Sequence, residues 1–227
     1  VITSTNSGEI SVTATGSTID EVDDDTAANI STGGVLSLTA GDAIGAVAAS
    51  GELDINVGTL RVSGAGTVDI LEADAIQLGD GTSGVTSSGA ITIETTNGAI
   101  TTGNSITTTV GNHNITLGSG GTNDITVGHT LTANGSGVID INSGAGFTLS
   151  DGITLSSTSG GITIDTSGVN ALNVNGTVQT GGTGTIVLTG SNAITMDATS
   201  LIQSADGAIT LSSGAGGVAV DVITSTN

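Results

Sequence analysis

The densest group of residues able to do chemistry is the acidic run Asp-Glu-Val-Asp-Asp-Asp at positions 20–25. Clustered carboxylates on a loop suit Ca²⁺, a hard cation that prefers oxygen ligands. The run therefore predicts one Ca²⁺ site with Asp20, Asp23, Asp24 and Asp25 as ligands. The spacing matches neither the EF-hand loop nor the Gly-Gly-x-Gly-x-Asp repeat of calcium-binding β-rolls. A solvated acidic corner that holds no cofactor explains the same residues, and we favour that interpretation.

Groups suited to catalysis are scarce in this chain. It has one Arg, no Lys, no Cys, no Trp, no Tyr and two His. Arg61 is the middle residue of Leu-Arg-Val, a position that points to solvent on a strand. His113 and His129 are separated by less than one repeat, so they would not stack on each other and are not expected to share a metal. A β-helix enzyme acting on acidic polysaccharide would need a basic group and aromatic platforms for the sugar. We therefore expect that the protein is not an enzyme.

Charge and composition exclude further classes of partner. The formal net charge is −20, which is the opposite of the basic surface that holds nucleic acid or anionic lipid. No apolar run approaches the roughly 20 residues that span a bilayer, so we expect no membrane insertion. With one Phe and 38 Gly, any core must be built from Val, Ile, Leu and Ala.

The residues above must be positioned by short strands, because aliphatic residues recur with a period of two and are followed by Gly, Asn or Ser. These short strands recur in columns, and successive members of the first column are 23 or 24 residues apart. The first such column contains Ile91, Ile115, Ile139, Ile162, Ile186 and Ile209. The second contains Ile100, Ile125, Phe147, Leu172, Ile194 and Val218, and the third contains Ile106, Leu131, Ile153, Val178, Ile202 and Ile223.

Three interleaved columns with one period predict an all-β fold, a right-handed parallel β-helix (β-solenoid) with three short strands per turn. Extended back, the pattern gives about nine turns of about 24 residues. The extension adds Ile10, Leu36 and Leu60 to the first column, Ile19, Ile44 and Val68 to the second, and Ile30, Leu53 and Ile76 to the third. This extension places Leu60 directly before Ile91, a step of 31 residues (91 − 60). We interpret the excess as a corner-loop insertion at residues 79–89.

The hexapeptide Val-Ile-Thr-Ser-Thr-Asn occurs at residues 1–6 and again at residues 222–227. If the two copies are equivalent, the period is 221 residues (222 − 1), and the next Ile10 falls 22 residues beyond Ile209 (231 − 209). That is close to one turn. Residues 1–227 are therefore expected to form a single β-solenoid array, one tandem repeat unit of a longer fibrous protein.

Outward threonines suggest an alternative of another class, an ice-binding solenoid. Thr92, Thr116, Thr163 and Thr210 fall in one outward column, and Thr101, Thr126, Thr148 and Thr195 fall in another. Ice binding favours paired, uninterrupted threonines, whereas Asp140 and Val187 break the first column. The strand propensity of Thr explains these columns more simply.

The Ala-Ile-Thr-Ile-x-Thr-x-x-Gly coils, as at residues 90–98, resemble the repetitive regions of giant bacterial surface adhesins of the filamentous-haemagglutinin type. The resemblance implies an extracellular, cell-surface filament or stalk. We expect a structural repeat that stacks end to end with copies of itself, or with adjacent repeats of the same chain, and meets neighbouring fibres through divalent cations. A calcium-bridged sheath, a matrix protein or an S-layer-like protein is the alternative within the same class.

Overall fold

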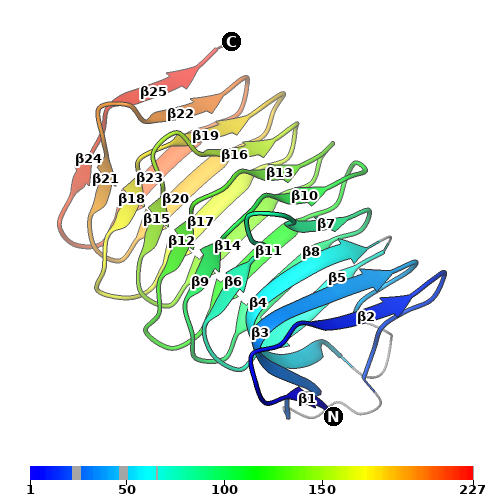
Figure 1. The fold of residues 1–227 in the computed structure, drawn as a ribbon. Coiled ribbons are helices and arrows are strands. Elements are labelled where there is room, and N and C mark those ends of the chain that lie inside the picture. The colour runs from blue at the N-terminus through cyan, green and yellow to red at the C-terminus, as the bar shows by residue number, and fades with distance from the viewer. Residues whose placement is uncertain (22–26, 46–50, 65, 227) are drawn as a thin grey trace.

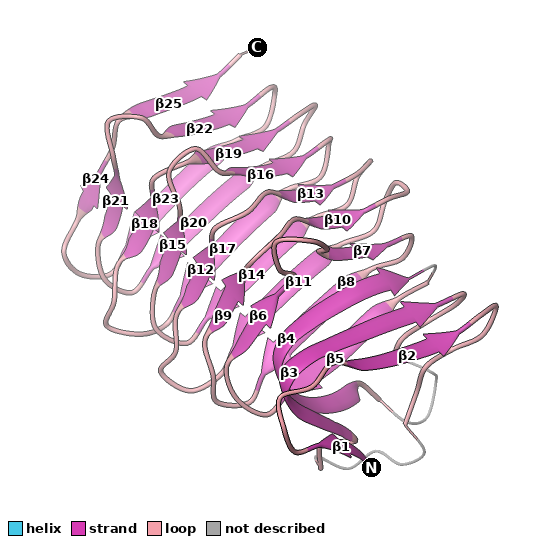
Figure 2. Cartoon of the chain, viewed as in Figure 1, coloured by secondary structure: helices cyan, strands magenta, loops and turns pink. Residues whose placement is uncertain are grey.

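The computed structural model describes residues 1–21, 27–45, 51–64 and 66–226. All regular structure in these residues is β-strand, and the strands pair in parallel as successive turns of a β-solenoid (Figure 2). The predicted fold, with about nine turns of about 24 residues, is confirmed. No helix long and apolar enough to cross a membrane occurs among the described residues.

From Val68 onward the chain winds around three faces, here named A, B and C, each a parallel ladder seen as a row of strands in Figure 1. Face A contains β5 (Val68–Glu72), β8 (Ile91–Thr95), β11 (Ile115–Ser119), β14 (Ile139–Ser143), β17 (Ile162–Thr166), β20 (Ile186–Gly190) and β23 (Ile209–Ser213). Face B contains β6 (Ile76–Leu78), β9 (Ile100–Thr102), β12 (Ile125–Val127), β15 (Phe147–Leu149), β18 (Leu172–Val174), β21 (Ile194–Met196) and β24 (Val218–Ala219). Face C contains β7 (Val85–Ser87), β10 (Ile106–Thr108), β13 (Leu131–Ala133), β16 (Thr154–Ser157), β19 (Thr177–Thr180), β22 (Leu201–Ser204) and β25 (Val222–Ser225).

The N-terminal turns contain β1 (Ile2–Ser4), β2 (Ile10–Ala14) and two longer strands, β3 (Ile30–Ala40) and β4 (Leu53–Gly64). β4 pairs along its length with three strands of the next turn, through Leu53 with β5, Thr59 with β6 and Val62 with β7. One long strand therefore connects the N-terminal turns to all three faces.

The core is a stack of aliphatic layers, because the inward residue of each strand is apolar and pairs with an apolar residue one turn away. Ile91, Ile115 and Ile139 are in register on face A and are fully buried. Phe147 is fully buried on face B between Ile125 and Leu172. Stacking is what closes this core, since each layer is covered only by its neighbours.

The registers confirm the first two predicted columns from Ile91 and Ile100 onward and correct the third at one position. Leu131 pairs with Leu155, and Ile153 lies two residues before the strand position it was expected to fill. Both are aliphatic residues in one segment, so the sequence period alone chose the wrong one.

The predicted connection of Leu60 to Ile91 is wrong. Ile91 pairs with Val68, whereas Leu60 pairs with Leu78 and Val62 pairs with Val85. Residues 79–89, expected to be an inserted corner loop, contain β7 and so include a full strand of face C. The expected pairs Ile30–Leu53 and Leu53–Ile76 are likewise replaced by Ile30–Ile55, Leu53–Ile70 and Ile76–Ile100.

Glycines stack at the corner that leads from face C to face A. Gly160, Gly184 and Gly207 each stand two residues before the first residue of a face A strand. A Cβ on Gly184 would lie 2.1 Å from the carbonyl oxygen of Gly160, and one on Gly207 would lie 1.9 Å from that of Gly184. Only glycine lets the backbones of adjacent turns approach this closely.

Candidate functional site

The predicted Ca²⁺ site falls mostly outside the described residues. Asp20 is half-buried beside Ile19, and Asp23, Asp24 and Asp25 lie outside the part of the chain that the structure describes. Within the described residues no group of three or more acidic, His or Cys side chains is arranged to hold a metal ion. The Ca²⁺ ligand set therefore stays a prediction.

Buried acidic side chains that sequence reasoning missed lie in the N-terminal turns. Glu21, Asp54 and Glu72 are 9%, 3% and 0% exposed. Glu21 accepts hydrogen bonds from the Asn29 side chain and from the backbone N–H of Asp54 at 3.5 Å. Glu72 could have been noticed in the sequence, because it stands at an inward position of Val-Asp-Ile-Leu-Glu where the period of two calls for an apolar residue.

Glu72 is held by backbone donors inside the solenoid. Its two carboxylate oxygens accept hydrogen bonds from the N–H of Val57 at 2.9 Å and of Asp74 at 3.2 Å. Burial nevertheless dominates and raises the pKa of Glu72 to about 7, against the lowering effect of these backbone donors. Near neutral pH this carboxyl is therefore shared between its neutral and charged forms.

Glu72 is the first member of a column of buried polar residues at the end of the face A strands. Thr95, Ser119 and Ser143 follow it in register, one turn apart, and each is at most 5% exposed. Thr95 donates to the carbonyl of Gly98 at 2.5 Å, Ser119 to that of Asn123 at 2.8 Å and Ser143 to that of Gly146 at 2.7 Å. These hydroxyls satisfy corner carbonyls, so the column is structural in character.

Arg61 is paired and not simply solvated as the sequence suggested. Its guanidinium forms an ion pair with Asp80 and lies 3.6 Å from Glu9, and its side chain is 22% exposed. The guanidinium, followed by the hydroxyl and N–H of Thr82, holds the pKa of Asp80 well below its usual range. Asp80 also accepts a hydrogen bond from the N–H of Ser83, so the ion pair fastens the loop that precedes β7.

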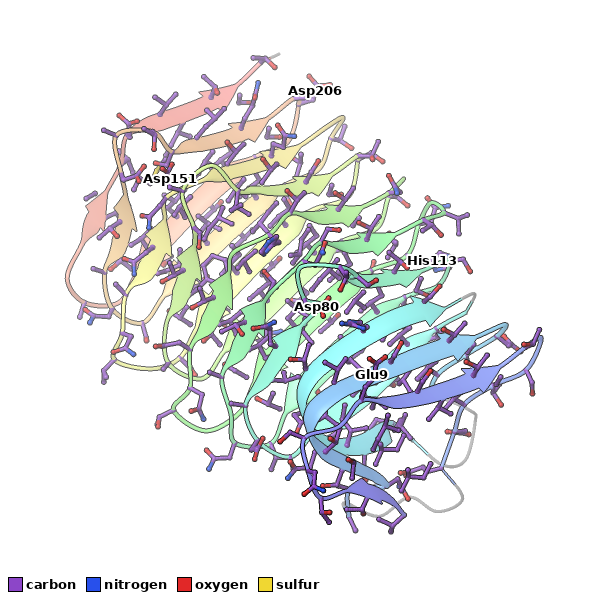
Figure 3. The ribbon with its side chains drawn as sticks, viewed as in Figure 1. Glu9, Asp80, His113, Asp151 and Asp206 are labelled. Carbon is purple, nitrogen blue, oxygen red and sulfur yellow. The ribbon has the colours of Figure 1, made fainter. Side chains whose placement is uncertain are left out.

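Charged and titratable side chains on the outer surface are dispersed. Figure 3 shows Glu9, Asp80, His113, Asp151 and Asp206 spread along the length of the solenoid. His129 is exposed, and its Nδ1 lies 3.0 Å from the carbonyl oxygen of Thr102. Dispersed charge of one sign suits solvation better than convergent acid–base chemistry.

The outward threonine columns are in register and are interrupted as expected. Thr116 pairs with Asp140, and Thr163 pairs with Val187. In the second column Asn173 separates Thr148 from Thr195, and its side-chain oxygen accepts a hydrogen bond from Thr195 at 2.6 Å. Neither column presents a flat array of threonine alone.

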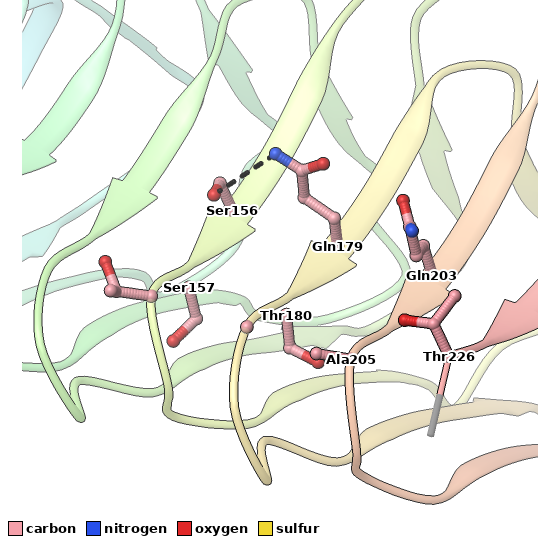
Figure 4. Close-up of a pocket in the computed structure, with 9 residues that line it drawn as sticks. Ser156, Ser157, Gln179, Thr180, Gln203, Ala205 and Thr226 are labelled. Carbon is pink, nitrogen blue, oxygen red and sulfur yellow. Dashed lines mark hydrogen bonds between the residues drawn. The ribbon is translucent and has the colours of Figure 1, made fainter.

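A polar groove of about 400 Å³ lies along face C near its C-terminal turns (Figure 4). Ser156, Gln179 and Gln203 line it in register, and Thr226 stands at its edge. The amide of Gln179 lies 3.5 Å from the hydroxyl of Ser156. The lining carries neither a charged group nor an aromatic ring, so the groove has no anchor for an ionic ligand or a sugar face.

The two end surfaces of the solenoid expose aliphatic side chains. Val1 and Ile2 are 94% and 49% exposed at one end, and Val222 and Ile223 are 45% and 38% exposed at the other. β1 pairs with β3 on one side, and β25 pairs with β22 on one side. Among the described residues no strand pairs with the other edge of β1 or β25. Each end surface therefore offers apolar side chains beside a free strand edge, which is the chemistry of a stacking surface.

Comparison with known proteins identifies no relative. No protein-family model matches the chain, and neither the curated proteins nor the solved structures contain a match to it.

Proposed function

We propose that this chain is a structural repeat of a long extracellular fibre, of the cell-surface adhesin-stalk kind, whose units stack end to end in one continuous solenoid. The two end surfaces form the joint. The length and stiffness of the fibre are its function, and the chain itself is no enzyme.

One observation carries this proposal: the shared hexapeptide pairs with matching residues in both of its positions. Ile223 pairs with Ile202 on one side, and Ile2, its counterpart, pairs with Ile30. Ser225 pairs with Ser204, and Ser4 pairs with Thr32. A single copy of the hexapeptide can therefore make both sets of contacts, aliphatic on aliphatic and hydroxyl on hydroxyl, as a strand between two turns.

The surface chemistry supports an extracellular fibre. A chain with no Lys and one partly buried Arg offers trypsin-like proteases one site. The net charge of −20 keeps neighbouring fibres apart by repulsion, and divalent cations would bridge them.

Chains of one, two and three units that share the hexapeptide at each joint test the proposal. Electron microscopy or small-angle scattering should show one stiff rod that lengthens by about 45 Å per unit, given about 4.8 Å per turn. Rods joined by flexible hinges, or a length that does not grow with unit number, would contradict it.

A matched pair of variants at the joint isolates its role. In the two-unit chain, Ile223→Asp places a charge between Ile202 and the following Ile30 and should split thermal unfolding into two transitions. Thr224→Asp changes the neighbouring outward residue, which is exposed and in register with Gln203, and should leave one transition. The same effect from both variants would count against a packed joint.

A further inference from the structure

At the turn where β4 meets β5, β6 and β7, the columns of the N-terminal turns continue into the three faces without a break. In the N-terminal turns Val12, Leu38 and Val62 stack in one column. Val62 then pairs with Val85, the first residue of face C. The column that begins with β2 therefore continues as face C.

At the C-terminal end the chain leads toward face A. β25 lies on face C, where it pairs with β22. In earlier turns the first residue of face A follows the last residue of the face C strand by five or six positions, as in Ser204 to Ile209 and Thr180 to Ile186. Ile10 follows Ser4, the counterpart of Ser225, by six positions. In a second copy, Ile10 therefore falls on face A, over Ile209.

The glycine pattern at the corner agrees with this placement. Gly207 stands two residues before Ile209, and Gly8 stands two residues before Ile10. Gly34 and Gly58 keep the same spacing before Leu36 and Leu60. Gly34 has no room for a side chain, since a Cβ there would lie 2.1 Å from the carbonyl oxygen of Ser7 one turn below. The close backbone approach of the face C to face A corner thus continues into the next copy.

Side-chain register agrees as well. With Ile10 over Ile209, the inward residue Val12 falls over Leu211 and the outward residue Ser11 falls over Thr210. Both strands alternate half-buried and exposed residues in the same order. The pairing therefore buries apolar on apolar and keeps polar residues outside.

We propose that successive units are rotated about the fibre axis by one face, about a third of a turn, so that face C of one unit continues face A of the unit before it. This inference rests on the proposed end-to-end fibre. Turn length agrees with it: Ile209 lies eight turns and 190 residues (209 − 19) after Ile19, so a period of 221 residues covers about 9.3 turns. Three units, about 130 Å of stacked strands, complete one rotation.

The rotation determines how the fibre meets its surroundings. Any feature that occurs once per unit, such as the Arg61–Asp80 ion pair, appears on a different face in each successive unit. A straight line drawn along the fibre surface then crosses a different face in each successive unit. Side-by-side fibres cannot pair identical faces continuously, which disfavours lateral sheet formation.

Disulfide trapping in a cysteine-free two-unit chain tests the rotation. The first pair is T210C in unit one with S11C in unit two, which the rotation brings to adjacent strands, within the Cα separation that a disulfide needs. The second pair is T224C in unit one with T13C in unit two, which belong to one register column and would be adjacent only if the units stacked without rotation. V187C with T210C in one unit, which are in register on β20 and β23, is the positive control for folding and geometry.

We expect the first pair to cross-link at least tenfold faster than the second, at a rate similar to that of the control. Faster cross-linking of the second pair would overturn the rotation and leave the end-to-end fibre intact. Failure of both pairs beside a cross-linked control would show that the units do not stack, and would overturn the fibre and the rotation together.

Discussion

Glu72 and Thr95 occupy adjacent positions of one buried column, in register on β5 and β8, and both are almost fully enclosed. The neutral hydroxyl of Thr95 donates a hydrogen bond to a corner carbonyl. Glu72 instead places a carboxyl in the buried column, where it accepts a hydrogen bond from the N–H of Val57. The solenoid therefore contains one position in this column whose charge depends on pH.

This position makes stability depend on pH. Burial raises the pKa of Glu72 from 4.5 in the unfolded chain to about 7, so the folded state binds this proton more tightly than the unfolded chain does. The contribution of the protonated carboxyl to the free energy of unfolding is therefore fully present below pH 4.5 and is lost as pH rises through about 7. The loss amounts to about 3 kcal/mol at most. Glu72→Gln should flatten the dependence of the free energy of unfolding on pH between 4.5 and 7, measured by urea denaturation.

Asp206→Asn is the control for Glu72, since it removes one exposed negative charge from a distant corner. It should keep the slope of the parent chain in that pH window. An equal slope in Glu72→Gln and the parent chain would show that Glu72 does not titrate there.

The glycine corner should tolerate no side chain. Gly184→Ala would place a Cβ 2.1 Å from the carbonyl oxygen of Gly160, and we expect a loss of about 2 kcal/mol or more in the free energy of unfolding. Gly81→Ala, where a Cβ would meet nothing within 4 Å, should change stability by less than about 0.5 kcal/mol. Equal effects in chemical denaturation would argue against close stacking at this corner.

The buried hydroxyl column should contribute to stability one residue at a time. Ser143→Ala leaves the carbonyl of Gly146 without the donor that lies 2.7 Å away, so we expect a cost of about 1 to 2 kcal/mol. Ser212→Ala, at an exposed outward position of β23, should be nearly neutral. Urea denaturation of both variants measures the difference, and a neutral Ser143→Ala would mean that the N–H of Ile125, which donates to the same carbonyl at 3.0 Å, is sufficient for it.

The Arg61–Asp80 pair should protect its loop. Arg61→Gln frees Asp80, which also accepts from the N–H groups of Thr82 and Ser83. We expect several-fold faster hydrogen exchange at these two amides and little change on face A. Glu9→Gln, which removes the partner at 3.6 Å whose side chain is 51% exposed, should have a smaller effect. Unchanged exchange in Arg61→Gln would show that Asp80 orders the loop alone.

The sequence by itself determined the solenoid, the turn length and most of the inward residues, because a period of two within strands and of about 24 between them follows from the chain alone. It also predicted the stacking of Thr116 with Asp140 and of Thr163 with Val187.

Only the tertiary structure decided which strand of the N-terminal turns stacks on which strand of the three faces. Leu60, Val68 and Ile91 each begin a short run in which aliphatic residues alternate with others, so spacing alone could not show that Ile91 rests on Val68, or that residues 79–89 contain the strand β7. The same holds for Arg61 and Glu72, whose partners come from other turns. The local sequence pattern specifies roughly how many residues make up one turn. Which strands pair between adjacent turns depends instead on the arrangement that buries the most apolar surface and satisfies the corner carbonyls.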